Sequence, residues 1–435
     1  MTGDDLQGAQ IASPKLTPSD SDGWYGYYAG YSASFASDAI KALAADGAPM
    51  RVLDPWNGSG TTTLAASLMG HQPIGVDRNP ALVVIAKGRH LPVSVQQSIA
   101  PLANDITTVA ARLLEESSLR THPSDELSTW FMPDAQTRVR ALERAIGQVL
   151  VCAVPEKTST PVHPRQLSTL AAFFYCALFT VVRQLTAPFR ASNPTWIRRP
   201  DDASQLLTTE WGVVVDGFVD AANDLSRRLR VEHDTGESSA DLRVGAAERM
   251  TVDRKVDLTL GSPPYCTRID YVIATQPELA VLGYSSDQIQ NLRRAMLGSP
   301  LTRKDSIEID SACGPLAQSF LNAVKSHPSK ASSTYYSRYF GGYLHDLCAA
   351  LARLHRVTRR DGTIALVVQD SFYKEAHFDL PGIVMEIGQR LGRRAERRDF
   401  AVPRTMASIH PGTRVYRSSF KAVESLVVLH PASSR

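Results

Sequence analysis

Short apolar runs that end in an acidic residue alternate with helical stretches near the start of the chain. The run MRVLDP begins at Met50 and the run QPIGVD begins at Gln72, and each predicts a buried strand. Between them, TTTLAASLMG has helical character and a glycine stop at Gly70. After the second strand, NPALVVIAKGR predicts a helix with Asn79 as its cap and Pro80 at its first position. This order predicts the opening of a parallel α/β sheet.

The pattern changes in the middle of the chain, where strand signals become scarce. Three long segments, 125–150, 167–185 and 212–230, carry apolar residues at helical spacing. The sequence therefore predicts a mostly helical insertion of domain size over residues 96–239.

The α/β pattern resumes after the insertion. Helical spacing predicts a helix over 339–357, and the sequence RRDG at 359–362 predicts a turn after it. The expected domains are therefore a disordered tail at 1–22, an α/β domain at 23–95 and 240–435, and the helical insertion between its two parts. Strands are predicted at 241–245, 256–265, 363–371 and 424–430.

Composition adds limits on the class of protein. The 435 residues are 43% hydrophobic and 21% charged, as in ordinary globular proteins, and no apolar run is long enough to span a membrane. The N-terminus lacks the basic and then apolar order of a signal peptide. None of the five cysteines forms a CxxC pair, which argues against structural zinc and favours a cytoplasmic protein.

Basic residues gather in two parts of a chain whose net charge is only +3. Nine basic and two acidic residues lie in 390–421, and four arginines and no acid lie in 183–199. Such clusters favour contact with a polyanion on one face of the protein. The alternative is that they form solvated helix faces and that Phe189 and Trp196 belong to the core.

The first strand leads into a glycine turn, LDPWNGSGTTT, at residues 53–63. A phosphate-binding P-loop needs a lysine after its last glycine, but Thr61 follows Gly60. The dinucleotide fingerprint GxGxxG also fails, because Gly58 and Gly60 are followed by Thr63 in the third glycine position. The turn therefore fits neither of these phosphate-binding motifs.

Two carboxylates favour a nucleoside ligand with little negative charge. Asp77 ends the second strand, 23 residues after Asp54, where an acid can accept hydrogen bonds from ribose hydroxyls. Asp54 ends the first strand and can face a cationic group. Such a site suits S-adenosylmethionine, which carries a sulfonium and an ammonium group and no phosphate. The alternative is a plain strand-end turn at Asp54 and Pro55.

A second motif, GSPPYCTRIDY, begins at Gly261 directly after a predicted strand. The two prolines fix the backbone and remove two donors, while their carbonyls stay acceptors. Ser262 adds a hydroxyl group and Tyr265 a flat ring. These groups fit a planar heterocycle with an amino group, whose hydrogens Ser262 and the Pro263 carbonyl would accept. The alternative is a rigid loop at a strand end.

Together, DPWNGSGTT and SPPY resemble the two motifs of the DNA amino-methyltransferases, which methylate the exocyclic amines of cytosine or adenine. The resemblance covers most of residues 23–95 and 240–435. The aromatic segment YYAGYSASFASDAI resembles the part of that family that closes over the methionine end of the cofactor, at Phe35 here. One position departs, because Ala246 stands where relatives carry the acid of a Gly-Asp pair, so that Glu248 or a backbone group would have to replace it.

The resemblance implies a Rossmann-like methyltransferase sheet and direct transfer of a methyl group from S-adenosylmethionine to a base flipped out of duplex DNA, without a metal. Cys266 is then structural. The resemblance implies catalytic roles for Ser262, Pro263, Pro264 and Tyr265, and cofactor contacts from Phe35, Asp54, Asn57, Gly58, Ser59, Gly60, Thr61, Thr62, Asp77, Arg78 and Asn79. Arginine and asparagine read base edges well, so the expected DNA contacts are Arg183, Arg190, Asn193, Trp196, Arg198, Arg268 and Arg404.

A serine at the first motif position is more typical of N4-cytosine than of N6-adenine enzymes. The expected activity is therefore N4-cytosine methylation of double-stranded DNA at a specific site, in restriction-modification or phage defence near the nucleoid. The alternatives are an N6-adenine enzyme, an enzyme of the same fold acting on RNA guanine or protein glutamine, and a catalytically weak DNA-binding protein. A homodimer and a cognate restriction or defence partner are left open.

Overall fold

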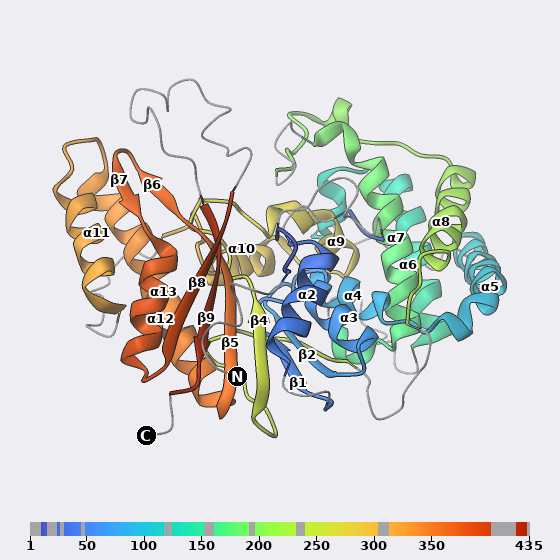
Figure 1. The fold of residues 1–435 in the computed structure, drawn as a ribbon. Coiled ribbons are helices and arrows are strands. Elements are labelled where there is room, and N and C mark those ends of the chain that lie inside the picture. Colours follow the sequence, from blue (N-terminus) through green and yellow to red (C-terminus); the bar gives the residue numbers. More distant parts are fainter. Residues whose placement is uncertain are drawn as a thin grey trace.

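A seven-stranded, mostly parallel sheet forms the centre of the protein in the computed structural model (Figure 1). Its order is β3-β2-β1-β4-β5-β9-β8, and only β9 and β8 run antiparallel to their neighbours. The structure describes residues 10–14, 24–26, 30–44, 48–116, 119, 124–151, 161–190, 196–231, 240–302, 313–401 and 423–432. The strands are β1 (Arg51–Asp54), β2 (Gln72–Asp77), β3 (Asp241–Val244), β4 (Val256–Gly261), β5 (Thr358–Gln369), β8 (Arg394–Ala401) and β9 (Val423–His430).

Helices cover both faces of the sheet because apolar residues in its strands point alternately to either side. Val52 of β1 packs on one face with α2 (Ala33–Leu43) and α3 (Thr61–Leu68). Its neighbour Leu53 packs on the other face, in a buried cluster that also contains residues of three later helices. These are α11 (Gly314–Ser326), α12 (Ser337–Val357) and α13 (Leu380–Arg390).

The helical insertion shares one apolar core with the α/β part instead of folding around a core of its own. Residues of α4 and of the segment after the SPPY motif belong to the same buried cluster as the insertion helices. The helices of this cluster are α4 (Pro80–Arg89), α5 (Gln96–Glu115), α6 (Pro133–Leu150), α7 (Thr169–Leu185), α8 (Trp211–Ser226), α9 (Gln276–Val281) and α10 (Ser286–Ala295). The insertion is therefore a layer outside α4, as Figure 1 shows.

The predicted α/β class and the mostly helical insertion are confirmed, with two local corrections. The turn expected at 359–362 is wrong, because these residues lie inside β5, where its pairing with β4 shifts register. The disordered tail expected at 1–22 is wrong for residues 10–14. Ile11 is buried beside α2, and the Ala12 amide donates to Asp38.

Two further findings concern membranes and metals. Within the described ranges, no helix is long and apolar enough to cross a membrane. Over the same residues, no group of three or more histidine, cysteine or acidic side chains could hold a metal ion.

Candidate active site

The glycine turn after β1 is built around the buried carboxylate of Asp54. Its Oδ1 accepts a hydrogen bond from the Trp56 amide at 3.0 Å, and its Oδ2 accepts one from the Thr62 hydroxyl at 2.6 Å. Gly60 caps the start of α3 with a φ of +87°, and a β-carbon there would lie 2.9 Å from that of Ala86. The turn therefore requires glycine both for its backbone conformation and for its close packing on α4.

The second carboxylate, Asp77, ties the glycine turn to the end of β2. It accepts hydrogen bonds from the amides of Gly58 and Asn79, both at 2.8 Å. Asn57 lies over Gly75 of β2, where an added β-carbon would come within 2.6 Å of its amide group. Asp54 and Asp77 thus flank one turn at neighbouring strand ends, as the sequence predicted.

Neither carboxylate forms an ion pair among the described residues, although both are buried. Burial raises the pKa of Asp54 to about 7, and the nearby charge of Asp77 adds to the increase. Burial also raises the pKa of Asp77, to about 6. Two buried acids that form no ion pair with the described residues make this turn a favourable place for a ligand that carries positive charge or donates hydrogen bonds.

An aromatic residue that the sequence analysis did not select reaches the same carboxylate. The Tyr31 hydroxyl is hydrogen-bonded to the Thr62 hydroxyl, which in turn donates to Asp54. Phe35, which was expected at the cofactor, is fully buried and lies edge-on to both Tyr31 and Phe400. Tyr31 lies in the aromatic segment already singled out. The sequence therefore identified the segment, and the structure was needed to identify Tyr31 within it.

The SPPY motif begins directly beside the glycine turn because β4 is the neighbour of β1. A β-carbon added at Gly261 would lie 2.6 Å from Asp54 Oδ1 and 3.1 Å from the Pro55 ring. Any residue larger than glycine at position 261 would therefore displace Asp54. Two motifs about 200 residues apart in sequence meet at one edge of the sheet.

The side chains of the SPPY loop are held by the two strands that follow in the sheet. The Ser262 hydroxyl donates to the Val367 carbonyl of β5 at 2.9 Å. The Tyr265 hydroxyl donates to Glu424 of β9, and its amide donates to the Tyr271 hydroxyl at 3.3 Å. The Ser262 oxygen and the Tyr265 ring are therefore held in place. Glu424 is a residue of the site that sequence reasoning missed.

Cys266, which follows this tyrosine, is buried. Burial raises the pKa of its thiol, which stays protonated at neutral pH. This environment is typical of a structural cysteine and unfavourable for a nucleophile.

The adenine end of the expected cofactor site differs from the family pattern. Glu248, the candidate substitute for the missing acid, forms an ion pair with Arg78 directly after Asp77. Ala246 lies just beyond β3, and its carbonyl accepts hydrogen bonds from the amides of Arg249 and Met250. Glu248 thus lies close to the end of β2, where its charge is already partnered by Arg78.

The other residues expected at the cofactor form the frame of the turn. Ser59 accepts a hydrogen bond from the Arg89 side chain at its carbonyl, and Thr61 is the first residue of α3. Asn79 caps α4 and donates to the Thr275 hydroxyl at 2.7 Å. This last contact connects the glycine turn to the chain that follows the SPPY loop.

The described residues among the expected DNA contacts have different surroundings. Arg183 is engaged inside the protein, where it forms an ion pair with the fully buried Glu278 at 2.7 Å. Arg198 and Trp196 are exposed, and Arg198 lies over the Phe189 ring. Arg268 is exposed beside the SPPY loop and lies over Tyr336, whereas Arg190 lines a cavity. Asn193 and Arg404 lie outside the described residues.

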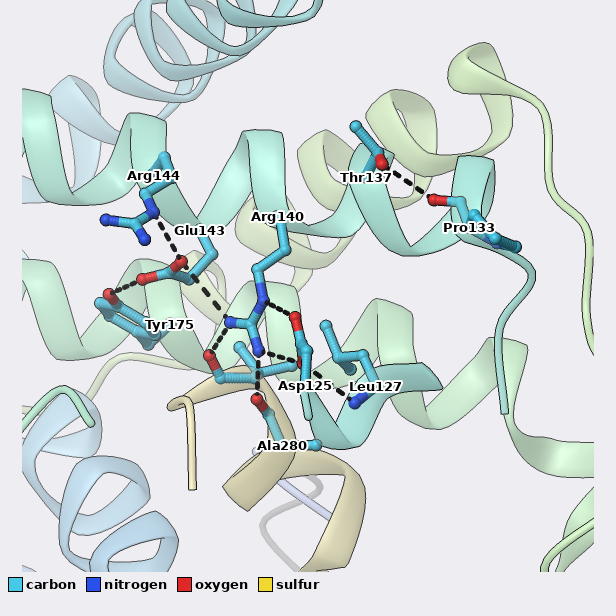
Figure 2. A network of polar contacts seen from close by, with 10 residues as sticks. Asp125, Leu127, Pro133, Thr137, Arg140, Glu143, Arg144, Tyr175 and Ala280 are labelled. Atoms are coloured by element: carbon cyan, nitrogen blue, oxygen red, sulfur yellow. Dashed lines mark hydrogen bonds and ion pairs between the residues drawn. The ribbon is translucent and has the colours of Figure 1, made fainter. Parts of the chain in front are cut away.

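A polar network joins the insertion to the segment that follows the SPPY loop (Figure 2). Arg140 of α6 donates to both oxygens of Asp125 at 2.8 Å, and to the carbonyls of Ala280 and Val281 at 2.7 Å. Burial alone would raise the pKa of Asp125, but the hydrogen bonds and charge of Arg140 lower it. The network therefore fixes the carboxyl end of α9 against the insertion.

The chain is similar to three characterised proteins. Type II methyltransferase M.BsoBI of Geobacillus stearothermophilus is 20% identical over 297 residues, which make up 66% of this chain and 57% of that relative. Type II methyltransferase M.AvaI of Nostoc sp. and that of Anabaena variabilis are each 24% identical over 151 residues, or 32% of this chain and 31% of theirs. The chain thus spans about half the length of the first relative. No family model and no solved structure matches the chain.

Proposed function

We propose that this chain, a relative of the DNA methyltransferases, transfers a methyl group from S-adenosylmethionine to the exocyclic N4 amine of cytosine in duplex DNA. The observation that carries the proposal is the contact between its two motifs. Gly261 of the SPPY loop lies so close to Asp54 of the glycine turn that only glycine fits. A cofactor bound at the turn would therefore lie next to a base bound at the SPPY loop.

The residues around the turn fit S-adenosylmethionine by their chemistry. Asp54 is buried without a cation, and an ammonium group would stabilise its ionised form. Asp77 keeps lone pairs beyond those used by two amides and can accept hydrogen bonds from ribose hydroxyls. When bound, the cofactor supplies an electrophilic methyl group on a sulfonium. Tyr31 and Thr62 would orient Asp54 toward its charged end.

The SPPY loop would hold the base amine and increase its reactivity. Such an amine is a weak nucleophile because its lone pair is delocalised into the ring. The Ser262 oxygen, whose own proton is directed to Val367, keeps lone pairs that can accept an amine hydrogen, and the Pro263 carbonyl can accept the other. Tyr265, held by Glu424, offers its ring for stacking on the flipped base. Catalysis would then consist mainly of positioning and local electrostatics.

The choice of cytosine rests on Ser262 at the first position of the motif, and N6-adenine methylation is the alternative.

Target recognition is assigned to the insertion at 96–239, which Arg140 joins to the segment beyond the SPPY loop. The cytoplasmic location, a homodimer and a cognate restriction partner stay predictions from sequence.

A transfer assay tests the proposal. The protein is incubated with tritiated S-adenosylmethionine and unmethylated DNA, RNA or protein, and label in each polymer is counted. Label is expected in DNA. The Ser262→Ala variant should lose at least about tenfold in rate while it binds the cofactor as before, because only the amine loses an acceptor. The proposal fails if DNA stays unlabelled, or if Ser262→Ala transfers as fast as the unchanged chain.

A further inference from the structure

A cavity of about 600 Å³ lies between residues 24–26 and the insertion helices α7 and α8. Three arginines (Arg183, Arg190 and Arg228) and two aromatic residues (Trp24 and Tyr25) contribute to its wall. Its volume is that of a site for a small organic ligand. Neither the SPPY loop nor the glycine turn contributes to its lining, so it is separate from the proposed active site.

Arg190 is the unusual residue of this cavity. Its guanidinium group makes no ion pair or hydrogen bond with any residue that the structure describes, and its Nη2 atom is buried. Arg183 on the same wall is fully engaged, since it pairs with Glu278, donates to the Gly26 carbonyl at 2.7 Å and lies over the Tyr25 ring. Of the three arginines on this wall, Arg190 is therefore the one whose guanidinium group has no ion pair or hydrogen bond with the described residues.

Electrostatics make this arrangement unfavourable without a ligand. Burial lowers the pKa of Arg190, and the like charge of Arg183 lowers it further. The charge of Glu278 opposes this change, although its Oε1 is already bonded to Arg183 and to the Tyr25 hydroxyl. Its Oε2 is buried and forms no hydrogen bond with the described residues. The buried Nη2 of Arg190 forms no hydrogen bond with the described residues, which costs free energy that a bound anion would recover.

We propose that this cavity binds a phosphate group carried by a nucleotide, with Arg190 as its cation. The planar fork of a guanidinium group matches a phosphate bidentately. Asp220 and Asp224 of α8 line the cavity as well, and their carboxylates can accept hydrogen bonds from the hydroxyl or amino groups of the same nucleotide. The phosphate belongs either to a free nucleotide or to a strand of DNA. If the phosphate belongs to DNA, the inference rests on the proposed function. If it belongs to a free nucleotide, it does not.

Thermal unfolding of the full chain with and without inorganic phosphate tests the site itself. Without phosphate, the Arg190→Gln variant should melt about 1–3 °C higher than the unchanged chain, because an unpaired charge beside Arg183 is removed. With phosphate, the unchanged chain should gain stability and the variant should not. Arg165→Gln, which removes an exposed arginine outside the cavity lining, is the control and should respond to phosphate as the unchanged chain does.

Calorimetric titrations with deoxycytidine monophosphate and with a duplex distinguish the two sources. For a free nucleotide, Arg190→Gln should weaken binding of the monophosphate at least about tenfold and leave DNA binding unchanged. For DNA, the variant should weaken duplex binding and reduce the slope of log Kd against log salt by about one. Equal phosphate responses of Arg190→Gln and the unchanged chain, or no response of either, would overturn the proposal whether or not methyl transfer occurs.

Discussion

At the scale of single residues, Asp54 is the centre of the proposed cofactor site. Its carboxylate is buried, hydrogen-bonded to Thr62 and Trp56, and close to the second acid, Asp77. The folded protein tolerates this carboxylate poorly in its ionised form, since burial raises the pKa to about 7. Residues kept at such a cost to stability are typical of functional sites.

The pH dependence of stability should show this cost. In the unfolded chain Asp54 ionises near pH 4, about three units below its folded pKa. Its contribution to folding is therefore fully present below about pH 4 and is lost as the pH rises through about 7. The melting temperature of the unchanged chain minus that of Asp54→Asn is measured as a function of pH. This difference should fall between pH 5 and pH 8. A difference that stays constant over this range would show that Asp54 ionises normally.

Variants of Tyr265 should separate its ring from its hydroxyl group. Tyr265→Ala removes the stacking surface and should reduce the rate of methyl transfer by about a hundredfold, without changing cofactor affinity. Tyr265→Phe keeps the ring and loses only the bond to Glu424, so that its rate should lie between those of Tyr265→Ala and the unchanged chain. Single-turnover rates and cofactor titrations measure the two effects. Equal rates for the two variants would show that stacking by the Tyr265 ring does not contribute to methyl transfer.

At the scale of elements, local signals were sufficient where an element and its cap are close in sequence. β1, β2, α3 and α4 were predicted from apolar runs, a glycine stop and the Asn79 cap, and all four are present. The turn expected at 359–362 failed because β5 is extended by its pairing with β4. There, Gly362 lies so close to β4 that a β-carbon would come within 2.7 Å of the Asp257 carbonyl.

The basic stretch after residue 390 shows the same limit of local reasoning. It was interpreted as a surface for a polyanion, but its first part forms strand β8. Arg393 is buried and donates to the carbonyls of Gly362 and Leu429, and Arg397 pairs with Asp379. A count of charges along the sequence does not reveal which arginines are used inside the fold.

The network around Arg140 should stabilise the contact between the insertion and α9. Arg140→Met would leave Asp125 and two carbonyls buried without their donor, so the free energy of unfolding should fall by about 3 kcal/mol. Arg144→Met is the control, because Arg144 contacts Glu143 only at 3.7 Å and should lose less than about 1 kcal/mol. Urea unfolding measures both values. Similar losses for the two variants would contradict the assignment of Arg140 as the link.

At the scale of the whole molecule, the sheet brings the two motifs together and the insertion packs against α4 and α9. The sequence placed Asp54, Asp77 and Ser262 at strand ends, and the parallel order of the sheet makes those ends neighbours. Tyr31, within the aromatic segment already singled out, and Glu424 of β9 were missed because both reach the site only through tertiary packing. Arg183 was expected to contact DNA. Instead it pairs with Glu278, which lies 95 residues away in the sequence.

The most direct test of the account is the identity of the methylated nucleoside. Unmethylated DNA is incubated with the protein and S-adenosylmethionine, digested to nucleosides and analysed by mass spectrometry. We expect N4-methylcytosine, with N6-methyladenine as the outcome if the pocket holds the larger base. The appearance of 5-methylcytosine, or the absence of any methylated nucleoside, would contradict transfer to an exocyclic amine at the SPPY loop.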